Sequence, residues 1–352
     1  MKPLRVAHVV CSEGFAGVER YVLQSALSLR EAGCDVTVVG GAVDTMGAPL
    51  REEGVGWAPA LTVRQAYRAL RGLGRVDVLD SHMTEADTAA VAAGLVGRIP
   101  VVSTRHFAAP RGADPVRRAV ASLVGARVAH QIAISRFVAE NVEGDSTVVH
   151  TGVPDVPDVD DAARERTVLV LQRLEAEKST DVAVRAWAAA GRRDGWRLRI
   201  VGDGAERAAL GELADRLGVA DSVDFLGFRS DVAAQLVAAS LVLAPTPREG
   251  LGLASLEAMA AGVPVVAARA SGAVGLLEEG VTGLIVPPTD IEGYADALQR
   301  FCEDEAFRLG AGRAGVAEAA GYKWERINQV VLDTYLRVIE RTRAAEPALA
   351  RC

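Results

Sequence analysis

The sequence has 352 residues, of which 50% are hydrophobic and 24% are charged. This balance excludes an intrinsically disordered chain, and the length favours two domains that each bury a core of their own. The formal net charge is -7, from 39 basic and 46 acidic residues with no long basic run, which argues against bulk nucleic-acid binding.

The N-terminal segment and the cysteines indicate where the protein is expected to work. The first residues lack the apolar core and cleavage site of a signal peptide, and predict a first β-strand instead. No apolar run elsewhere reaches the length of a membrane-spanning helix. The four cysteines have no paired spacing, so neither disulfides nor a zinc site are predicted. A cytoplasmic location is therefore expected.

The first half of the chain alternates short apolar segments with Ala-rich helical stretches. Strands are predicted at LRVAHVV, DVTVVGG, VDVLDSH, PVVSTRH and HQIAIS, and helices from about Val18 to Ala32 and near Ala86 to Val96. Strands that alternate with helices are typical of a parallel sheet covered by helices. A Pro- and Asp-rich segment at 151–166 interrupts the pattern and is predicted to be a linker.

The second half repeats the alternation and predicts a second doubly wound domain. Its strands are predicted at TVLVLQRL, RLRIVGDG, VDFLGF, LVLAPTP, VPVVAARA and TGLIVPP. From Ile291 onward the pattern becomes helical. We therefore place the domains at residues 1–160 and 161–322, with a C-terminal helix at 323–352.

The segment PREGLGLASLEAMAAGVPVVAA places acids and glycines between a buried strand and a helix. Such a loop lies at the carboxyl edge of a parallel sheet, where ligands bind. Gly250, Leu251 and Gly252 let the backbone approach a ligand, and the free N–H groups of the following helix suit a diphosphate. Glu257 can accept two hydroxyl hydrogen bonds, as a ribose offers, and Glu249 can reach a second hydroxylated group. The simpler alternative is a plain turn followed by N-terminal helix charges.

This segment resembles the nucleotide-sugar signature of the retaining glycosyltransferases of family 4. That signature has two Glu separated by seven residues, followed by Ala-x-Ala-x-Gly-x-Pro-Val-Val, and EGLGLASLEAMAAGVPVVAA matches it throughout. Other motifs of the family follow in the expected order and cover nearly the whole chain. The resemblance implies a GT-B fold, in which two Rossmann-like domains face each other across a cleft and the C-terminal helix returns to the first domain.

The segment LQRLEAEKS resembles the family's Gly-Arg-Leu-x-x-x-Lys-Gly motif, whose Arg and Lys hold the pyrophosphate. Arg173 and Lys178 occupy those positions, and two cations would neutralise the charge that grows on a departing diphosphate. Gln172 and Ser179 stand where glycines are usual, which puts the shape of this loop in doubt. A solvated pair of surface cations is the alternative.

Two shorter motifs of the second half carry weaker signals. Gly202 and Gly204 resemble the family's Gly-x-Gly turn, although an ordinary strand-to-helix turn would look the same. Gly227 and Phe228 resemble the segment whose backbone meets the base, with the end of a buried strand as the alternative.

In the first half, SEGFAGVERYV resembles the family's glycine-rich turn over the diphosphate. Gly14 and Gly17 occupy it, without the spacing of a dinucleotide fingerprint, and helix capping alone could explain them. His106, after STR, resembles the histidine that touches hydroxyls of the donor sugar, and His82 and Glu85 are weaker candidates. For each histidine a satisfied structural role is the alternative.

Two further segments near the domain boundary resemble the family only in part. Ser135 resembles a family Ser before a short helix, and a plain N-cap is the alternative. His150 and Thr151 replace the usual Pro-Asn, so the contact made by that Asn is not carried over.

The resemblance implies a metal-independent, retaining transfer of a sugar from a nucleoside diphosphate sugar, most often UDP-linked, to a hydroxyl. No Asp-x-Asp motif placed to hold a metal is found, and no cofactor is expected besides the donor, which is a substrate. The segments at 42–63 and 107–116, expected to be short acceptor loops, lack a wide apolar face and favour a soluble acceptor. A sugar-nucleotide epimerase or hydrolase, and a non-catalytic nucleotide-sugar-binding protein, remain alternatives. The sequence leaves the oligomeric state open.

Overall fold

The computed structural model describes residues 2–112, 115–153, 156, 164–191, 195–269 and 271–349. The chain divides into two compact units: unit 1 comprises Met1–Gly152 and Trp324–Cys352, and unit 2 comprises Val153–Lys323. Most of the segment at 151–166, predicted to be a linker, lies outside the described residues. The expected domain limits at 160 and 322 stay predictions.

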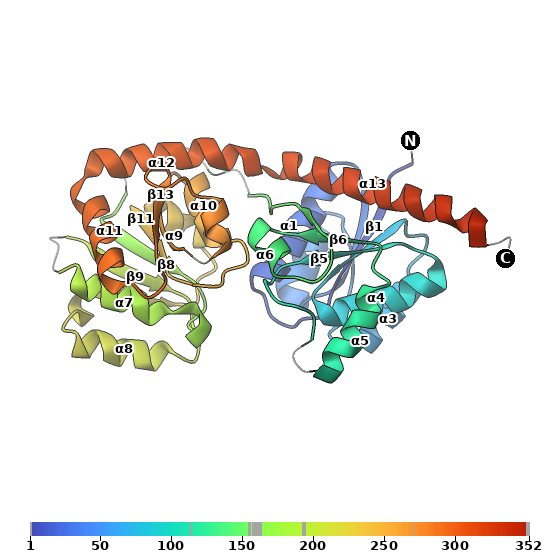
Figure 1. The fold of residues 1–352 in the computed structure, drawn as a ribbon, viewed down its shortest axis with the longest axis horizontal. Coiled ribbons are helices and arrows are strands. Elements are labelled where there is room, and N and C mark those ends of the chain that lie inside the picture. Colours follow the sequence, from blue (N-terminus) through green and yellow to red (C-terminus); the bar gives the residue numbers. More distant parts are fainter. Residues whose placement is uncertain are drawn as a thin grey trace. The chain divides into compact units, whose positions relative to one another are not determined.

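Unit 1 contains a parallel sheet, drawn in blue to green in Figure 1. Among the described residues its seven strands follow the order β3-β2-β1-β4-β5-β6-β7. The strands are β1 (Arg5–Val10), β2 (Asp35–Gly40), β3 (Gly56–Ala58), β4 (Val78–His82), β5 (Val101–Arg105), β6 (His130–Ala133) and β7 (Thr147–Val148). The helices are α1 (Gly17–Glu31), α2 (Ala48–Glu52), α3 (Val63–Gly72), α4 (Thr84–Gly97), α5 (Pro115–Gly125), α6 (Arg136–Glu140) and α13 (Trp324–Leu349), with a π-helical turn η1 (Val43–Gly47).

The two faces of this sheet are covered by different helices. Alternate residues such as Ala7 and Val9 of β1 pack with the apolar faces of α3 and α4. The intervening residues point to the opposite face, where α13 packs against α1. Both faces of the central strands are therefore buried, which explains the almost uninterrupted apolar runs that predicted these strands.

Unit 2 contains a second parallel sheet, with the six-strand order β10-β9-β8-β11-β12-β13 in the part of the chain that is described (Figure 1). The strands are β8 (Thr167–Leu171), β9 (Arg197–Val201), β10 (Val223–Gly227), β11 (Leu241–Ala244), β12 (Val265–Ala268) and β13 (Gly283–Val286). The helices are α7 (Thr180–Ala189), α8 (Arg207–Arg216), α9 (Val232–Ala238), α10 (Leu253–Ala260), α11 (Ile291–Glu303) and α12 (Glu305–Ala319), with short 3-10 turns that include η3 (Ala176–Lys178) and η5 (Gly272–Gly275).

The core of unit 2 forms where the central strands meet their covering helices. Trp187 of α7 and Tyr294 and Phe301 of α11 are buried in a cluster with Val168, Leu198 and other strand residues. Aromatic side chains bury large apolar areas, so this cluster supplies much of the driving force that folds the unit. The two parallel α/β units confirm the predicted fold class.

Every predicted strand is present, and the structure adds elements that the sequence analysis did not predict, among them α3, α5 and β7. One segment also differs from its expected form. Residues 42–63 were expected to be an acceptor loop, but they contain η1, α2 and β3. The difference arises because Trp57 anchors this segment, its indole N–H donating to the carbonyl oxygen of Gly40. None of the helices in the described part of the chain combines the length and apolarity that crossing a bilayer requires.

Helix α12 offers a matched test of packing in unit 2. A Cβ atom at Gly312 would lie 2.2 Å from the carbonyl oxygen of Gly262, whereas one at Gly310 would meet nothing within 4 Å. We expect Gly312→Ala to lower the free energy of unfolding by about 1–3 kcal/mol, because the backbones must move apart. Gly310→Ala is expected to raise it by up to about 1 kcal/mol, through helix propensity alone. Urea denaturation of both variants tests the close contact, and equal effects would contradict it.

Candidate active site

In unit 2, Lys178 and Glu249 meet at the carboxyl ends of β8 and β11. Lys178 ends η3, and its Nζ atom lies 2.7 Å from Oε2 of Glu249. The two side chains are 18% and 35% exposed. An ion pair this accessible contributes at most about 1 kcal/mol to folding. The pair is therefore dispensable for the fold, and the ammonium group remains within reach of an anionic ligand.

Arg173, the other predicted cation, follows β8 on the same loop but points outward. Its guanidinium pairs with Glu177 at 3.0 Å, and both side chains are more than half exposed. Such a pair between residues four apart on a surface exchanges easily for other partners. The structure therefore brings Lys178 and Glu249 together and leaves Arg173 at the rim of the same loop.

The two positions where glycines are usual have acquired structural roles. The amide of Gln172 donates to the backbone carbonyl of Lys178 at 3.0 Å and to Thr180 Oγ1 at 2.8 Å, and its oxygen accepts from Thr246 at 2.8 Å. Ser179 has φ 53° and ψ 41°, the left-handed conformation that glycine adopts freely. The loop therefore keeps a glycine-like shape at Ser179, and Gln172 holds the backbone of Lys178 in place.

Gly202 and Gly204 are required by the approach of two backbones. A Cβ atom at Gly202 would lie 1.9 Å from the carbonyl oxygen of Gln172, and one at Gly204 would lie 2.4 Å from that of Leu174. The backbone N–H of Leu174 also donates to the carbonyl of Asp203 at 2.9 Å. These glycines therefore brace the loop that carries Arg173, and packing alone accounts for their presence.

The loop between β11 and α10 carries the longest predicted motif. Gly252 has φ 84° and directly precedes α10, whose first turn has no side-chain cap. The backbone N–H of Gly272 donates to the carbonyl of Glu249 at 2.7 Å, so η5 holds the loop from the other side. Gly250 and Leu251, in the same loop, are buried. Uncapped N–H groups and the helix dipole make the start of α10 suitable for a phosphate group.

Two remaining predicted residues of unit 2 lie at this edge of the sheet and differ in exposure. Glu257 lies just over one turn into α10 and is 7% exposed. Phe228 follows β10 and is 72% exposed, next to Gly227 at φ 67°. A large aromatic ring this exposed stabilises the unit little, and its face is free to stack on a planar ligand.

In unit 1, the predicted glycine turn leads into α1. Gly14 and Gly17 are exposed, and a Cβ atom at Gly17 would meet nothing within 4 Å. Packing within the described residues therefore does not require glycine at Gly17. Ser135 is the N-cap of α6, its Oγ atom accepting from the N–H of Val138 at 3.0 Å. Its capping role accounts for this serine.

A pocket of about 660 Å³ lies at the carboxyl ends of β4 and β5 in unit 1. His106, Glu85, Arg105 and Phe107 are among the residues that line it. Met83, also in the lining, has φ 74°, an uncommon conformation for a residue with a side chain. His106 is 7% exposed and Phe107 is 59% exposed. The pocket therefore combines a nearly buried imidazole with an accessible aromatic rim.

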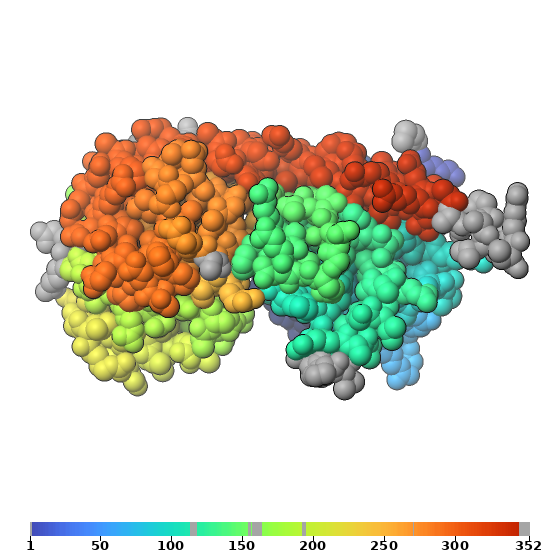
Figure 2. Space-filling view, in the orientation of Figure 1, coloured from blue at the N-terminus to red at the C-terminus, as the bar shows by residue number. Residues whose placement is uncertain are grey.

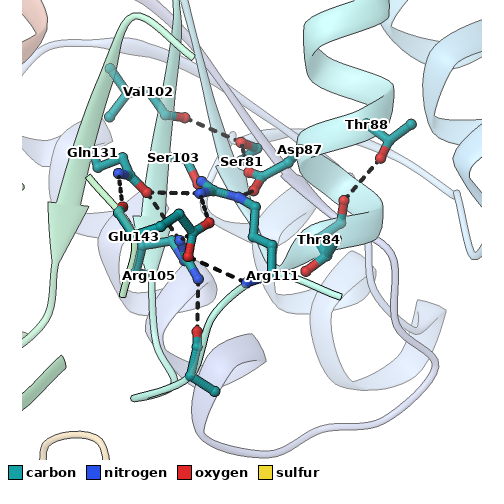
Figure 3. Close-up of polar contacts among 11 residues, drawn as sticks. Ser81, Thr84, Asp87, Thr88, Val102, Ser103, Arg105, Arg111, Gln131 and Glu143 are labelled. Atoms are coloured by element: carbon teal, nitrogen blue, oxygen red, sulfur yellow. Dashed lines mark hydrogen bonds and ion pairs between the residues drawn. The ribbon is translucent and has the colours of Figure 1, made fainter. Parts of the chain in front are cut away.

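A buried ionic network holds the wall of this pocket in place (Figure 3). Arg111 is 4% exposed and donates to Asp87 at 2.6 Å and to Ser103 at 2.8 Å. Arg105 and Arg111 both donate to Glu143. Burial raises the pKa of Glu143, but a backbone hydrogen bond and the two guanidinium groups stabilise its carboxylate more and hold the pKa below its usual range. The segment between Arg105 and Arg111 is thus tied to β5, β6 and α4. Breaking one partner of such a network leaves a buried charge, which is strongly destabilising.

The opposite face of the same strands carries a buried cluster of histidines. Nδ1 of His8 lies 3.0 Å from Nε2 of His82, and Nδ1 of His82 lies 3.0 Å from Nε2 of His106. Burial lowers the pKa of His8 to about 4 and that of His106 to about 3. Asp80 lies behind them and accepts hydrogen bonds from Tyr335 and Thr104, and burial raises its pKa to about 7.

Within the described residues, one group has the composition of a metal site, namely His8, Asp80 and His82. Its facing nitrogens are already joined by a hydrogen bond, so a bound ion would have to displace that bond. The groups therefore suit a polar network better than a metal centre.

The sequence predicted His82 and His106 but missed His8 and Asp80, as well as Arg111 and Gln172. A polar residue within an apolar strand, as in VAHVV and VLDSH, was the available signal for His8 and Asp80. Arg111 gave no signal, because its partners come from α4, β5 and the segment after α6. His150, half-buried, and Thr151, buried, lie outside both groups of contacts.

Comparison with known proteins finds two family models that together match most of this chain. Residues 15–155 match the family described as Glycosyltransferase Family 4, and residues 157–316 match Glycosyl transferases group 1. A D-inositol 3-phosphate glycosyltransferase from Mycolicibacterium smegmatis is 30% identical, over 94% of this chain and 88% of that protein. The chain belongs to the group 1 glycosyltransferases. A D-inositol 3-phosphate glycosyltransferase from Kribbella flavida is 39% identical over 49% of this glycosyltransferase and 44% of its own length.

Solved structures share the fold of this glycosyltransferase. Anabaena HepE in complex with UDP-glucose has a TM-score of 0.81 and 22% identity, over 94% of this chain and 99% of that one. Sucrose-phosphate synthase from Thermosynechococcus elongatus has a TM-score of 0.74 and 21% identity, over 96% and 100% of the two chains. Both likenesses establish the GT-B type of fold.

The histidine cluster predicts how stability depends on pH. Burial depresses the pKa of His8, His82 and His106 below 6.5, so on unfolding these imidazoles take up protons when the pH is below that value. Asp80, with its raised pKa of about 7, instead releases a proton on unfolding above about pH 4. Together these groups bind about two more protons in the unfolded chain between pH 4 and 6.5, so stability falls as the pH drops through this range.

Urea unfolding at several pH values measures this dependence. His82→Gln is expected to reduce the slope of unfolding free energy against pH by about one proton, because one buried imidazole is removed. His130→Gln serves as the comparison, because burial also lowers the pKa of His130 but this imidazole is only partly buried, so its removal should reduce the slope less. An unchanged slope for His82→Gln would contradict a neutral, buried His82.

Proposed function

We propose that this glycosyltransferase transfers a sugar from a UDP-sugar to a hydroxyl group, with retention of configuration and without a metal ion. The observation that carries the proposal is the pair of Lys178 and Glu249 at 2.7 Å, at the sheet edge where α10 begins without a side-chain cap. A cation and a helix N-terminus at one sheet edge suit a diphosphate. The complexes of Anabaena HepE with UDP and with UDP-glucose support the choice of UDP.

The donor is assigned to residues at the carboxyl edge of the unit 2 sheet. Lys178 and the first N–H groups of α10 hold the diphosphate, and Arg173 swings in from the rim. Glu257 accepts hydrogen bonds from the ribose hydroxyls, and the exposed ring of Phe228, beside Gly227, meets the base. Glu249 accepts from a hydroxyl of the transferred sugar when Lys178 turns to the phosphate.

In unit 1, Gly14 and Gly17 are assigned to a close approach of the protein backbone to the substrate, since packing does not require glycine at Gly17. His106 contacts a hydroxyl of the sugar, as the resemblance to the family implies. The pocket beside it is open to a hydroxylated substrate.

The reaction exchanges one carbon–oxygen bond for another at the anomeric carbon. The bond to the β-phosphate oxygen breaks, its electron pair stays on the phosphate, and the carbon gains oxocarbenium character. The acceptor oxygen then bonds to the same face, and its proton passes to the leaving phosphate. Lys178, Arg173 and the start of α10 stabilise the charge that grows on the diphosphate, which is where electrostatic catalysis acts most strongly.

The acceptor is proposed to be a small, water-soluble polyol or saccharide. D-inositol 3-phosphate is the first acceptor to test, because relatives named as D-inositol 3-phosphate glycosyltransferases match this chain. Transfer with retention is read from the anomeric configuration of the product. Consumption of the UDP-sugar with no acceptor present would instead support an epimerase or hydrolase.

A thermal-shift panel with UDP, GDP, ADP and NAD tests the donor class first. A ligand that binds only the folded protein raises the melting temperature by mass action. We expect a selective rise with UDP. A rise with GDP or ADP alone would change the donor, and a rise with NAD alone would refute the assignment of the site.

Removing the cations tests their role in the departure of the diphosphate. Lys178→Ala is expected to lower kcat by at least about a hundredfold and to reduce the thermal shift with UDP, because charge on the leaving group goes unneutralised. Arg173→Ala should have a smaller effect of the same sign.

Arg185→Ala is a matched control for Arg173→Ala. Arg185 belongs to the same unit and forms an exposed ion pair with Asp181 four residues away, as Arg173 does with Glu177. Arg185→Ala also removes one positive charge, but at a position in α7 away from the strand ends. The UDP shift and the turnover should therefore remain at the wild-type values. If turnover and the UDP shift fall equally in the Arg173 and Arg185 variants, the loss reflects net charge and not the position of Arg173. Normal turnover in Lys178→Ala would contradict the role of Lys178 in stabilising the leaving group.

A further inference from the structure

Three imidazoles form a continuous hydrogen-bonded chain that ends at the unit 1 pocket. His8 lies in the middle of β1, His82 ends β4 and His106 follows β5, on neighbouring parallel strands. The facing ring nitrogens are 3.0 Å apart at both junctions. His106 is the member that lines the pocket, so the chain connects the core of the unit with its surface.

Each imidazole in this chain is neutral and carries one N–H. His8 and His82 are fully buried and His106 nearly so, and burial lowers the pKa of all three because it disfavours the charged form. A neutral imidazole donates through one nitrogen and accepts through the other. The tautomers of the three histidines are therefore coupled. If both hydrogen bonds are kept, the row of imidazoles has only two proton arrangements.

The two arrangements differ at their ends. In the first, each histidine carries its proton on Nδ1, so His8 donates to His82 and His82 donates to His106. In the second, each carries it on Nε2 and the direction reverses. Nε2 of His8 is buried without a hydrogen-bond partner in the described part of the chain, so the second arrangement would leave an unpaired N–H in the core. Orphaned buried N–H groups are rare.

The carboxyl group behind the chain favours the same arrangement. At pH 7.5, above its raised pKa of about 7, Asp80 is mainly a carboxylate, and it accepts hydrogen bonds from the hydroxyls of Tyr335 and Thr104. Its Oδ2 atom lies 3.7 Å from Nδ1 of His8 and 4.0 Å from Nε2 of His82. A proton on Nδ1 of His8 is therefore nearer to the negative charge than one on Nε2 of His82.

We propose that His8 and His82 are positioning residues that lock His106 in the Nδ1–H tautomer, so that His106 presents a hydrogen-bond donor to the pocket. Nε2 of His106 accepts from His82, and Nδ1 has no partner among the described residues. His106 then donates to a substrate oxygen and is no proton acceptor for the reacting hydroxyl. The identity of that oxygen rests on the proposed function, whereas the tautomer does not.

Nitrogen NMR of the full-length protein labelled with 15N-histidine reads the tautomers directly. The protein has 5 histidines, and single His→Gln variants assign their NMR signals. At pH 7.5 we expect His8, His82 and His106 each to show a protonated Nδ1 and an unprotonated Nε2. A proton on Nε2 of His106, or a charged His106, would overturn the proposal.

His8→Leu removes the inner donor while roughly conserving volume. Nε2 of His82 would then lack a donor and face only Asp80, so its proton should move to Nε2 and His106 should acquire Nε2–H character. The matched control is His130→Gln, whose partner in the same unit is Thr147 and which is outside the chain of imidazoles. An Nδ1–H signal of His106 that is unchanged in His8→Leu would overturn the positioning role.

Activity provides a second, separable readout. If sugar transfer is established, His8→Leu should lower kcat severalfold while the thermal shift with UDP, whose assigned residues lie in unit 2, stays at the wild-type value. Loss of the UDP shift together with kcat would indicate general damage and overturn a role confined to His106. The wild-type spectrum decides the tautomer even if His8→Leu does not fold. If the spectrum shows the predicted tautomers but no sugar transfer is detected, the proposed function is refuted and the positioning role is left intact.

Discussion

Parallel pairing of every described strand is the constraint on which the rest of this structure depends. It directs the carboxyl ends of neighbouring strands to one edge of each sheet, so loops far apart in sequence meet there. Lys178 and Glu249 are 71 residues apart and come together only because β8 pairs with β11. The functional groups of this glycosyltransferase are consequences of that pairing.

The alternation of side chains along a strand adds a second consequence. In β4, Asp80 and His82 point to the face covered by α1 and α13, while Ser81 points to α4. Polar side chains therefore enter the core on both faces near the pocket, and each face needs a complete set of partners. The ionic network in Figure 3 satisfies one face, and the histidine chain satisfies the other.

The two units use opposite electrostatic strategies. In unit 2 the charged groups, Lys178 and Arg173, stay partly exposed and paired with carboxylates that a ligand can replace. In unit 1 the buried imidazoles are neutral, and Arg105 and Arg111 form ion pairs that hold the pocket wall in place. Figure 2 shows the outer surface of this part of unit 1 in teal to green. An exchangeable charge suits the binding of an anion, whereas a rigid neutral donor suits the orientation of a hydroxyl.

The sequence by itself determined the alternation of strands and helices, the two α/β units and the family, because buried parallel strands and the long Glu-containing motif are local patterns. It also identified Lys178, Glu249 and His106 one by one. It left undecided how Gln172 and Ser179 replace glycine, since the left-handed backbone of Ser179 and the contacts of Gln172 depend on Thr246 from another strand end. Only the tertiary structure joined His8 to His106, because hydrogen bonds between strands depend on sheet order and register, which no local pattern records.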